Sequence, residues 1–210
     1  MLQSYFTIKT YGTNEIVINK SRFITHVKRV TTEKEAQNFI DSVKKMHWNA
    51  NHNCSAYLIG EQDLIQKAND DGEPSGTAGV PMLEVLKKRG LKDTVVVVTR
   101  YFGGIKLGAG GLIRAYGSAV TEGINAVGMV ERRLVHEMEI SADYTWLGKL
   151  ENNLRQNAYL IKDIKYEDNV RILTYVPEAN RTSFTDWITN MTNGQAVLQD
   201  NGVTYLEKNI

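Results

Sequence analysis

The sequence predicts an α+β protein with two domains, and two observations lead to this prediction. Strand patterns and helix patterns alternate along the whole chain, which excludes an all-helical or all-strand fold. The last part of the chain shows the order β-α-β-β-α-β, which is that of the ferredoxin-like sandwich. We place the boundary near Gly128, so that the domains span residues 1–128 and 129–210.

The first domain is expected to open with antiparallel strands. Alternating apolar residues predict these strands at 4–10, 15–19 and 22–30, joined by turns such as residues 11–14. Thr32 can cap a helix over residues 33–46, whose apolar residues recur at helical spacing.

The rest of the first domain continues with strands and helices in turn. A strand pair is predicted at 54–60 and 64–68, a helix at 79–88, a strand at 94–102 and a helix at 111–127. Pro81 suits the first turn of the helix at 79–88, and Gly90 stops it. The unbroken apolar run Val95–Val98 marks a central strand buried on both faces.

The second domain has a regular alternation of elements. Its strands are predicted at 132–141, 159–167, 170–176 and 196–206, and its helices at 144–157 and 181–191. His136 lies on the apolar face of the first of these strands, where we expect it to be hydrogen-bonded.

Composition excludes several classes of protein. The chain has 42% apolar residues but no apolar run near the ~20 residues of a membrane helix, and no signal peptide at its start. We therefore expect a cytoplasmic protein that does not associate with a membrane.

Cys54 is the only cysteine, which rules out an internal disulfide. Net charge is +1 overall, with +4 (16 Lys+Arg, 12 Asp+Glu) in residues 1–128 and −3 (9 and 12) in 129–210.

The stretch RYFGGIKLGAGGLIRAYG, residues 100–117, combines glycines with cations in a strand–loop–helix arrangement that suits anion binding. Its candidate anion- or nucleic-acid-binding residues are Arg100, Gly103, Gly104, Lys106, Gly108, Gly110, Gly111 and Arg114. Ala109 stands where the Walker motif needs lysine, and Ile113 where the dinucleotide motif needs glycine. The stretch is therefore not a recognised nucleotide motif. Gly117 and Gly123 are better explained by helix packing.

Arg114 needs a negative partner, because it is expected about one turn into a helix whose start is already positive. The partner is either a ligand or the acidic loop NDDGEPSG, which supplies Asp70, Asp71 and Glu73. Ser75 in this loop does not form a nucleophile elbow. Ser75 or Thr77 is expected to cap the helix that follows.

Neither a metal site nor a cofactor is predicted. His47, His52 and Cys54 lie close together in HWNANHNC, but their spacing matches no zinc pattern. Core and helix-cap roles are favoured for them. The carboxylates at residues 70–73 are typical of an exposed turn as much as of a cation site.

The motifs NDDGEPSGTAGVPML and VVVVTRYFGGIKLGAGGLIRAYG, with KSRFITHV and HWNANHNCSAY upstream, closely resemble the signature of the IMPACT/YigZ family. The likeness covers residues 17–125. It implies that the first domain is an α/β sandwich similar to the second domain of a small-subunit ribosomal protein. The second domain resembles the smaller ferredoxin-like module of bacterial members.

The resemblance implies a role in translation without establishing a reaction. Eukaryotic relatives modulate a stress-kinase pathway of translation initiation through an extra N-terminal domain, which we do not expect here. The first hypothesis is a non-enzymatic RNA- or ribosome-associated protein, with a protein partner in translation control also considered. Arg100, Lys106 and Arg114 would contact phosphates, with Lys20 and Arg22 further out.

The alternative hypothesis is an enzyme, such as a hydrolase. It would act on a phosphorylated or carboxylated small molecule in a cleft between the two glycine-rich loops. Asp71 and Glu73 would then face Arg100 and Arg114 as acid/base and oxyanion groups.

Overall fold

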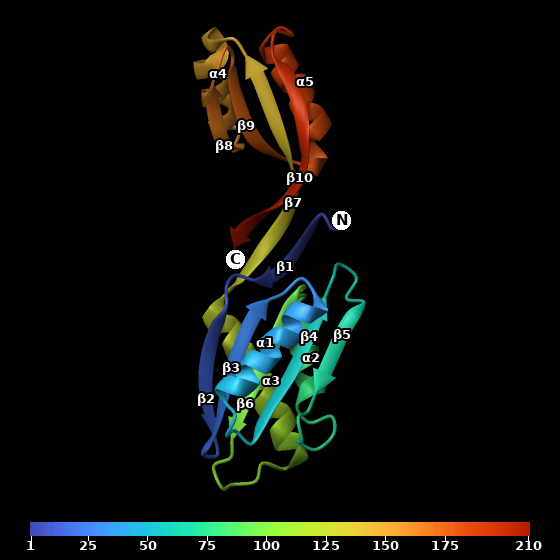
Figure 1. Ribbon diagram of the computed structural model, residues 1–210. Coiled ribbons are helices and arrows are strands. Elements are labelled where there is room, and N and C mark those ends of the chain that lie inside the picture. The colour runs from blue at the N-terminus through green and yellow to red at the C-terminus, as the bar shows by residue number, and fades with distance from the viewer. The chain divides into compact units, whose positions relative to one another are not determined.

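The computed structural model describes residues 1–210 and divides them into two compact units (Figure 1). The N-terminal unit comprises Tyr5–Arg132 with Lys208–Ile210, and the C-terminal unit comprises Met1–Ser4 with Arg133–Glu207. Each unit has a sheet and its own apolar core. The domain boundary near Gly128 remains a prediction of the sequence.

The N-terminal unit is built on a five-stranded sheet in the order β2-β3-β6-β4-β5. Its strands are β2 (Gly12–Ile18), β3 (Ser21–Arg29), β4 (His52–Ile59), β5 (Ile65–Asn69) and β6 (Thr94–Tyr101). All neighbouring strands are antiparallel. The central strand β6 carries the fully buried run Val95–Val98, which confirms the prediction that both of its faces are covered.

Helices cover both faces of this sheet. On one face α1 (Glu33–Met46) packs its apolar side against Tyr57, Val95 and Val97. On the other face α2 (Gly79–Lys88) and α3 (Gly108–Val127) pack against Val96 and Val98. Figure 1 shows α1 crossing one side of the sheet and α2 and α3 on the other.

Local signals in the sequence place the ends of α1 and α2. The hydroxyl of Thr32 accepts a hydrogen bond from the backbone N–H of Glu35 at 3.2 Å, so the predicted cap of α1 is confirmed. Helix α2 ends at Lys88, and Gly90 follows with a positive φ of 65°. Both helices match the predicted ranges within a residue.

Two predictions at the start of the chain are wrong. Residues 12–14 belong to strand β2, so no turn connects residues 11–14; the hairpin turn is Asn19–Lys20, both with positive φ. Strand β1 (Ser4–Ile8) pairs with β7 (Met129–Ala142) instead of the next strand in sequence. Alternation predicts a strand but not its neighbour, because pairing is decided by tertiary packing.

Helix α3 begins at Gly108, three residues before the predicted start. Gly108, Gly110 and Gly111 therefore form its first turn and do not belong to the preceding loop. Glycine lowers helix propensity by about 1 kcal/mol per residue, which is why the sequence pattern hides this turn. Gly123 in the same helix packs against β3, since a Cβ there would lie 2.5 Å from Thr25 Cγ2.

The C-terminal unit follows the predicted order of elements. Its elements are β7, α4 (Leu147–Gln156), β8 (Leu160–Tyr166), β9 (Val170–Pro177), α5 (Arg181–Met191) and β10 (Val197–Asn209). The sheet order β10-β7-β9-β8 is that of the ferredoxin-like fold. Helices α4 and α5 bury Leu150, Leu154, Phe184 and Ile188 against one face of this sheet. The predicted α+β fold class is confirmed.

Candidate functional site

A pocket of about 390 Å³ lies in the N-terminal unit between the acidic loop, residues 70–76, and the glycine-rich loop, residues 102–107. We call it the loop pocket. Its lining residues are Asn51, His52, Glu73, Pro74, Arg100, Phe102, Lys106, Leu107, Gly108, Ala109 and Leu112. The two motifs that were singled out in the sequence thus line one cavity.

Strand ends bring these residues together. His52, the first residue of β4, lies opposite Arg100 near the end of β6. The backbone of Gly103 then passes so close to the β2–β3 turn that a Cβ would lie 2.0 Å from the carbonyl carbon of Lys20. Only glycine fits this approach. The same turn holds the glycine-rich loop through the Gly103 N–H, which donates to Ser21 Oγ at 3.2 Å.

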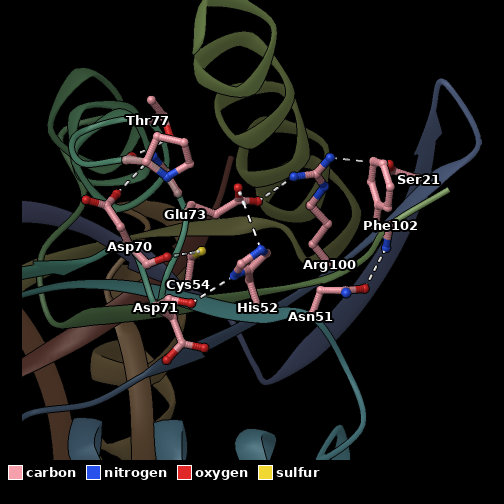
Figure 2. Close-up of polar contacts among 12 residues, drawn as sticks. Ser21, Asn51, His52, Cys54, Asp70, Asp71, Glu73, Thr77, Arg100 and Phe102 are labelled. Carbon is pink, nitrogen blue, oxygen red and sulfur yellow. Dashed lines mark hydrogen bonds and ion pairs between the residues drawn. The ribbon is translucent and has the colours of Figure 1, made fainter. Parts of the chain in front are cut away.

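A buried ion pair forms the floor of the loop pocket (Figure 2). Arg100 Nη1 donates to Glu73 Oε1 at 2.6 Å, and the side chains are only 6% and 4% exposed. Tyr116 from α3 donates its hydroxyl to the same oxygen at 2.8 Å. Glu73 Oε2 accepts no hydrogen bond, and His52 Nε2 lies 3.8 Å from it. One carboxylate oxygen therefore remains available.

The guanidinium of Arg100 lies between two aromatic rings, with its Cζ 5.4 Å from the centroid of Phe23 and 5.6 Å from that of Phe102. Such cation–π contacts stabilise a buried arginine. Its Nε is buried and has no hydrogen-bond partner. Arg100 thus keeps one unsatisfied donor inside the protein, below the floor of the pocket.

His52 is held in one orientation by the acidic loop. Its Nδ1 lies 2.9 Å from the carbonyl oxygen of Asp71, an acceptor that places the ring proton on Nδ1. The Nε2 atom faces Glu73, 3.8 Å from its Oε2. Cys54, behind this wall, is not a nucleophile, because burial raises the pKa of its thiol to about 12.

Asp70 organises the acidic loop from inside. Its carboxylate accepts backbone hydrogen bonds from Gly76, Ala78 and Gly79 at 2.8–3.0 Å. Burial raises the pKa of Asp70, but these three donors outweigh it and leave the pKa below its usual value. The start of α2 at Gly79 is therefore capped by a residue nine positions upstream of it.

The predicted cap of α2 by Ser75 or Thr77 is wrong. Ser75 is exposed, and the hydroxyl of Thr77 donates to the carbonyl oxygen of Pro74 at 2.6 Å. Neither side chain caps the helix, whose N-cap position is Ala78.

Asp71 is also bound within the protein. Its side chain accepts hydrogen bonds from Lys44 Nζ and from the backbone N–H of Asn53, each at 2.6 Å. It does not face Arg100 or Arg114. The arrangement needed by the enzyme hypothesis is thus only partly formed, because Glu73–Arg100 is the one pair between its acidic and basic groups.

The predicted cations divide into two groups. Arg100 is buried and paired, whereas Lys106 and Arg114 form no ion pair or side-chain hydrogen bond. Arg114 is the seventh residue of α3, so the helix start opposes its charge only weakly. It lies in a groove between α2 and α3 with Lys88 and Arg89, and its Nη1 reaches back to within 3.7 Å of a Cβ position on Gly110.

Phe102 and Asn51 are two of the pocket residues that the sequence patterns did not indicate. Phe102 is 46% exposed, and Asn51 holds the Phe102 N–H through its side-chain oxygen at 2.8 Å. The available signal was an aromatic residue directly before the first glycine of the glycine-rich loop. Of the outlying cations, Lys20 is at the β2–β3 turn, and Arg22 forms a bidentate pair with Glu15 at 2.8 and 2.9 Å.

A chain of polar side chains lies on the other face of the sheet, beside α1. Tyr11, His26, His47 and Tyr101 are linked in this order by contacts of 3.0–3.2 Å. Burial, with a contribution from His47, lowers the pKa of His26 to about 4. Burial lowers the pKa of His47 in the same direction. This series of hydrogen-bonded side chains is therefore expected to form with both imidazole rings neutral.

We expect the N-terminal unit to lose stability on mild acidification. His26 takes up a proton near pH 6.5 when unfolded but only near pH 4 when folded, so stability falls as pH drops through this window. The free energy of unfolding should decrease by about 2 kcal/mol from about pH 7 to about pH 5. Urea denaturation at several pH values measures this free energy. The variant His26→Gln should lose most of this dependence; an unchanged pH profile would contradict the assignment.

The fold and the pocket define a class of protein: a two-unit α+β chain whose first unit carries a glycine-rich, cation-lined pocket and whose second is ferredoxin-like. The chain matches the Impact N-terminal domain over residues 19–124 and a domain of unknown function, DUF1949, over residues 140–195. The protein belongs to the IMPACT family.

Relatives cover both units. The chain is 66% identical to the IMPACT family member YvyE of Bacillus subtilis (strain 168), over 99% of this chain and 96% of the relative. It is 34% identical to YigZ of Escherichia coli (strain K12), over 86% and 90%. A solved structure described as a crystal structure of a hypothetical protein has a TM-score of 0.61 and 32% identity, covering 94% of this chain and 97% of that one.

The eukaryotic relatives share a smaller part. The chain is 38% identical to the IMPACT homologue of Dictyostelium discoideum over 47% of its own length and 29% of that protein. Among the helices of this chain, none has the length and apolar character needed to span a bilayer.

Proposed function

We propose that this protein is a non-enzymatic RNA- or ribosome-associated factor that binds phosphate groups with its N-terminal unit, in the cytoplasm, and takes part in the control of translation. The observation that carries the proposal is the pair of unpartnered cations, Lys106 and Arg114, on either side of the glycine-rich start of α3. Paired surface cations are already neutralised, whereas unpaired ones can exchange their counterions for phosphates.

The local architecture supports phosphate contacts. Helix α3 has no side-chain cap and no acidic residue in its first turn, so its leading N–H groups are open to an anion. Lys88 and Arg89 add two cations to the groove that contains Arg114, where Glu122 is the one acidic lining residue. Lys20 adds a cation at the neighbouring turn. Such contacts position a nucleic acid without reading its sequence.

The enzyme alternative has weaker support. Of the groups assigned to catalysis, Asp71 is bound by Lys44, Arg114 lies in the α2–α3 groove, and Arg100 is neutralised by Glu73. The loop pocket therefore supports binding better than a reaction.

The proposal predicts salt-sensitive RNA binding. The double variant Lys106→Ala/Arg114→Ala should weaken binding to single-stranded RNA about tenfold and lower the slope of log affinity against log salt by about one to two units. Fluorescence anisotropy at several salt concentrations measures both quantities, and co-sedimentation tests ribosomes.

A charge-matched control is available in the same unit. Lys34 and Lys67 are exposed on α1 and β5 and form no ion pair. Lys34→Ala/Lys67→Ala removes the same charge and should leave the affinity unchanged. If both double variants weaken binding equally, or if wild type binds neither RNA nor ribosomes at low salt, the proposal is wrong.

A further inference from the structure

The loop pocket contains groups that phosphate-backbone contacts alone do not use. It offers an exposed aromatic ring and a carboxylate oxygen that accepts no hydrogen bond. The following inference rests on the proposed function and concerns what this pocket holds.

One end of the pocket suits an anion. Gly108 and Ala109, the first residues of α3, line it, and Leu107 at the N-cap position offers no side-chain cap. The unpaired Lys106 lies beside them. Helix N–H groups and an ammonium are the partners that a phosphate prefers.

Arg100 is the buried cation of the pocket lining. The side chain of Arg100 is 6% exposed and its Nε has no hydrogen-bond partner, although Arg100 lines the same pocket. Leaving a buried charged donor unsatisfied is unfavourable. This atom is closed to the pocket, so it makes no contact with a ligand there, and Arg100 contributes to the site through its charge.

Part of the pocket lining is apolar and includes one aromatic ring. Phe102, 46% exposed, forms part of the wall with Pro74, Leu107 and Leu112. Exposed aromatic rings beside cations are the usual stacking platforms for nucleic-acid bases.

The floor of the pocket calls for a hydrogen-bond donor. The side chain of Glu73 is 4% exposed and lines the pocket; its Oε2 accepts no hydrogen bond, while its Oε1 already accepts from Arg100 and Tyr116. The exocyclic amino group of adenine, guanine or cytosine is such a donor, whereas uracil has none. The amide nitrogen of Asn51, whose oxygen is bound to the Phe102 N–H, is free to donate to a base edge.

We propose that the loop pocket binds a single nucleotide unit, with the phosphate at the start of α3 and Lys106, the base on Phe102, and its amino group at Glu73. The volume of about 390 Å³ is in the range of small-ligand sites. The nucleotide comes either from a splayed-out RNA strand or from a free mononucleotide, since both present the same chemistry.

To test the proposal, the full chain is titrated with GMP, AMP, CMP, UMP, inorganic phosphate and a short single-stranded RNA. Binding is measured by calorimetry and by changes in NMR chemical shifts. Saturable binding of the amino-bearing nucleotides, tighter than that of UMP and of phosphate, is expected. Phe102→Ala should weaken it five- to a hundredfold, the range found for lost base stacking, and Phe102→Tyr should restore it. Trp48, 82% exposed and outside the pocket lining, gives the matched control Trp48→Ala, which should bind like wild type.

The titrations with mononucleotides and with RNA distinguish the two possible sources of the nucleotide. Mononucleotide binding that depends on Phe102 without RNA binding supports the pocket with a free nucleotide as its ligand, and contradicts the proposed function. RNA binding weakened by Phe102→Ala, with no mononucleotide binding, supports the pocket with RNA as the source. RNA binding unaffected by Phe102→Ala, or phosphate competing as well as GMP, overturns the nucleotide pocket and leaves the proposed function intact. Absence of all binding overturns both.

Discussion

Replacing Glu73 with alanine is expected to lower the free energy of unfolding of the N-terminal unit by about 3–5 kcal/mol, the cost of breaking a buried ion pair from one side. The change leaves Arg100, 6% exposed, without its counter-charge at 2.6 Å. It also removes the acceptor of the buried Tyr116 hydroxyl. Urea denaturation followed by circular dichroism measures the loss.

A second variant separates the pair from its surroundings. Glu73→Ala/Arg100→Met removes both charges, and replacing a buried pair by apolar groups is often near neutral. The double variant should therefore be more stable than Glu73→Ala alone. If Glu73→Ala unfolds like wild type, or if the double variant is the less stable one, the ion pair does not hold the floor of the loop pocket.

Replacing Asp70 with alanine is expected to destabilise the same unit by about 3–4 kcal/mol, because three backbone N–H groups lose a charged acceptor. These donors belong to Gly76, Ala78 and Gly79, which connect the acidic loop to the start of α2. The acidic loop should then loosen, which hydrogen exchange at these amides measures as lost protection.

Two control variants distinguish the hydrogen bonds that Asp70 accepts from the effect of its charge. Asp70→Asn keeps one side-chain oxygen and should retain part of the stability. Asp41 on α1 is exposed and accepts a hydrogen bond only from Gln37, so Asp41→Ala should cost less than about 0.5 kcal/mol. Equal effects at residues 70 and 41 would contradict the capping role.

These stability effects bear on functional tests of the loop pocket. Glu73 and Asp70 hold its walls, so their variants lose binding through structure alone. Lys106, Arg114 and Phe102 are not part of a buried network apart from the contact between Phe102 and Arg100. Their variants therefore report on the ligand.

Much of the secondary structure follows from local patterns in the sequence. The run Val95–Val98, the cap at Thr32 and the order of elements in the C-terminal unit each depend on neighbouring residues along the chain. Apolar periodicity and capping act over a few residues, and for that reason they are readable without a structure. Where they failed, at the start of α3, three glycines removed the periodic signal.

The sequence by itself determined the family, the α+β fold class and the two motifs that line the loop pocket. The tertiary structure decided how their charges are shared: Glu73 pairs with Arg100, Asp71 with Lys44, and Asp70 with the backbone of its own loop. It also left Arg114 without a partner and placed Phe102 in the pocket wall. Pairs separated by 27 residues, as Glu73 and Arg100 are, meet only when the strand ends converge, and the choice among similar carboxylates depends on distances of a few ångströms.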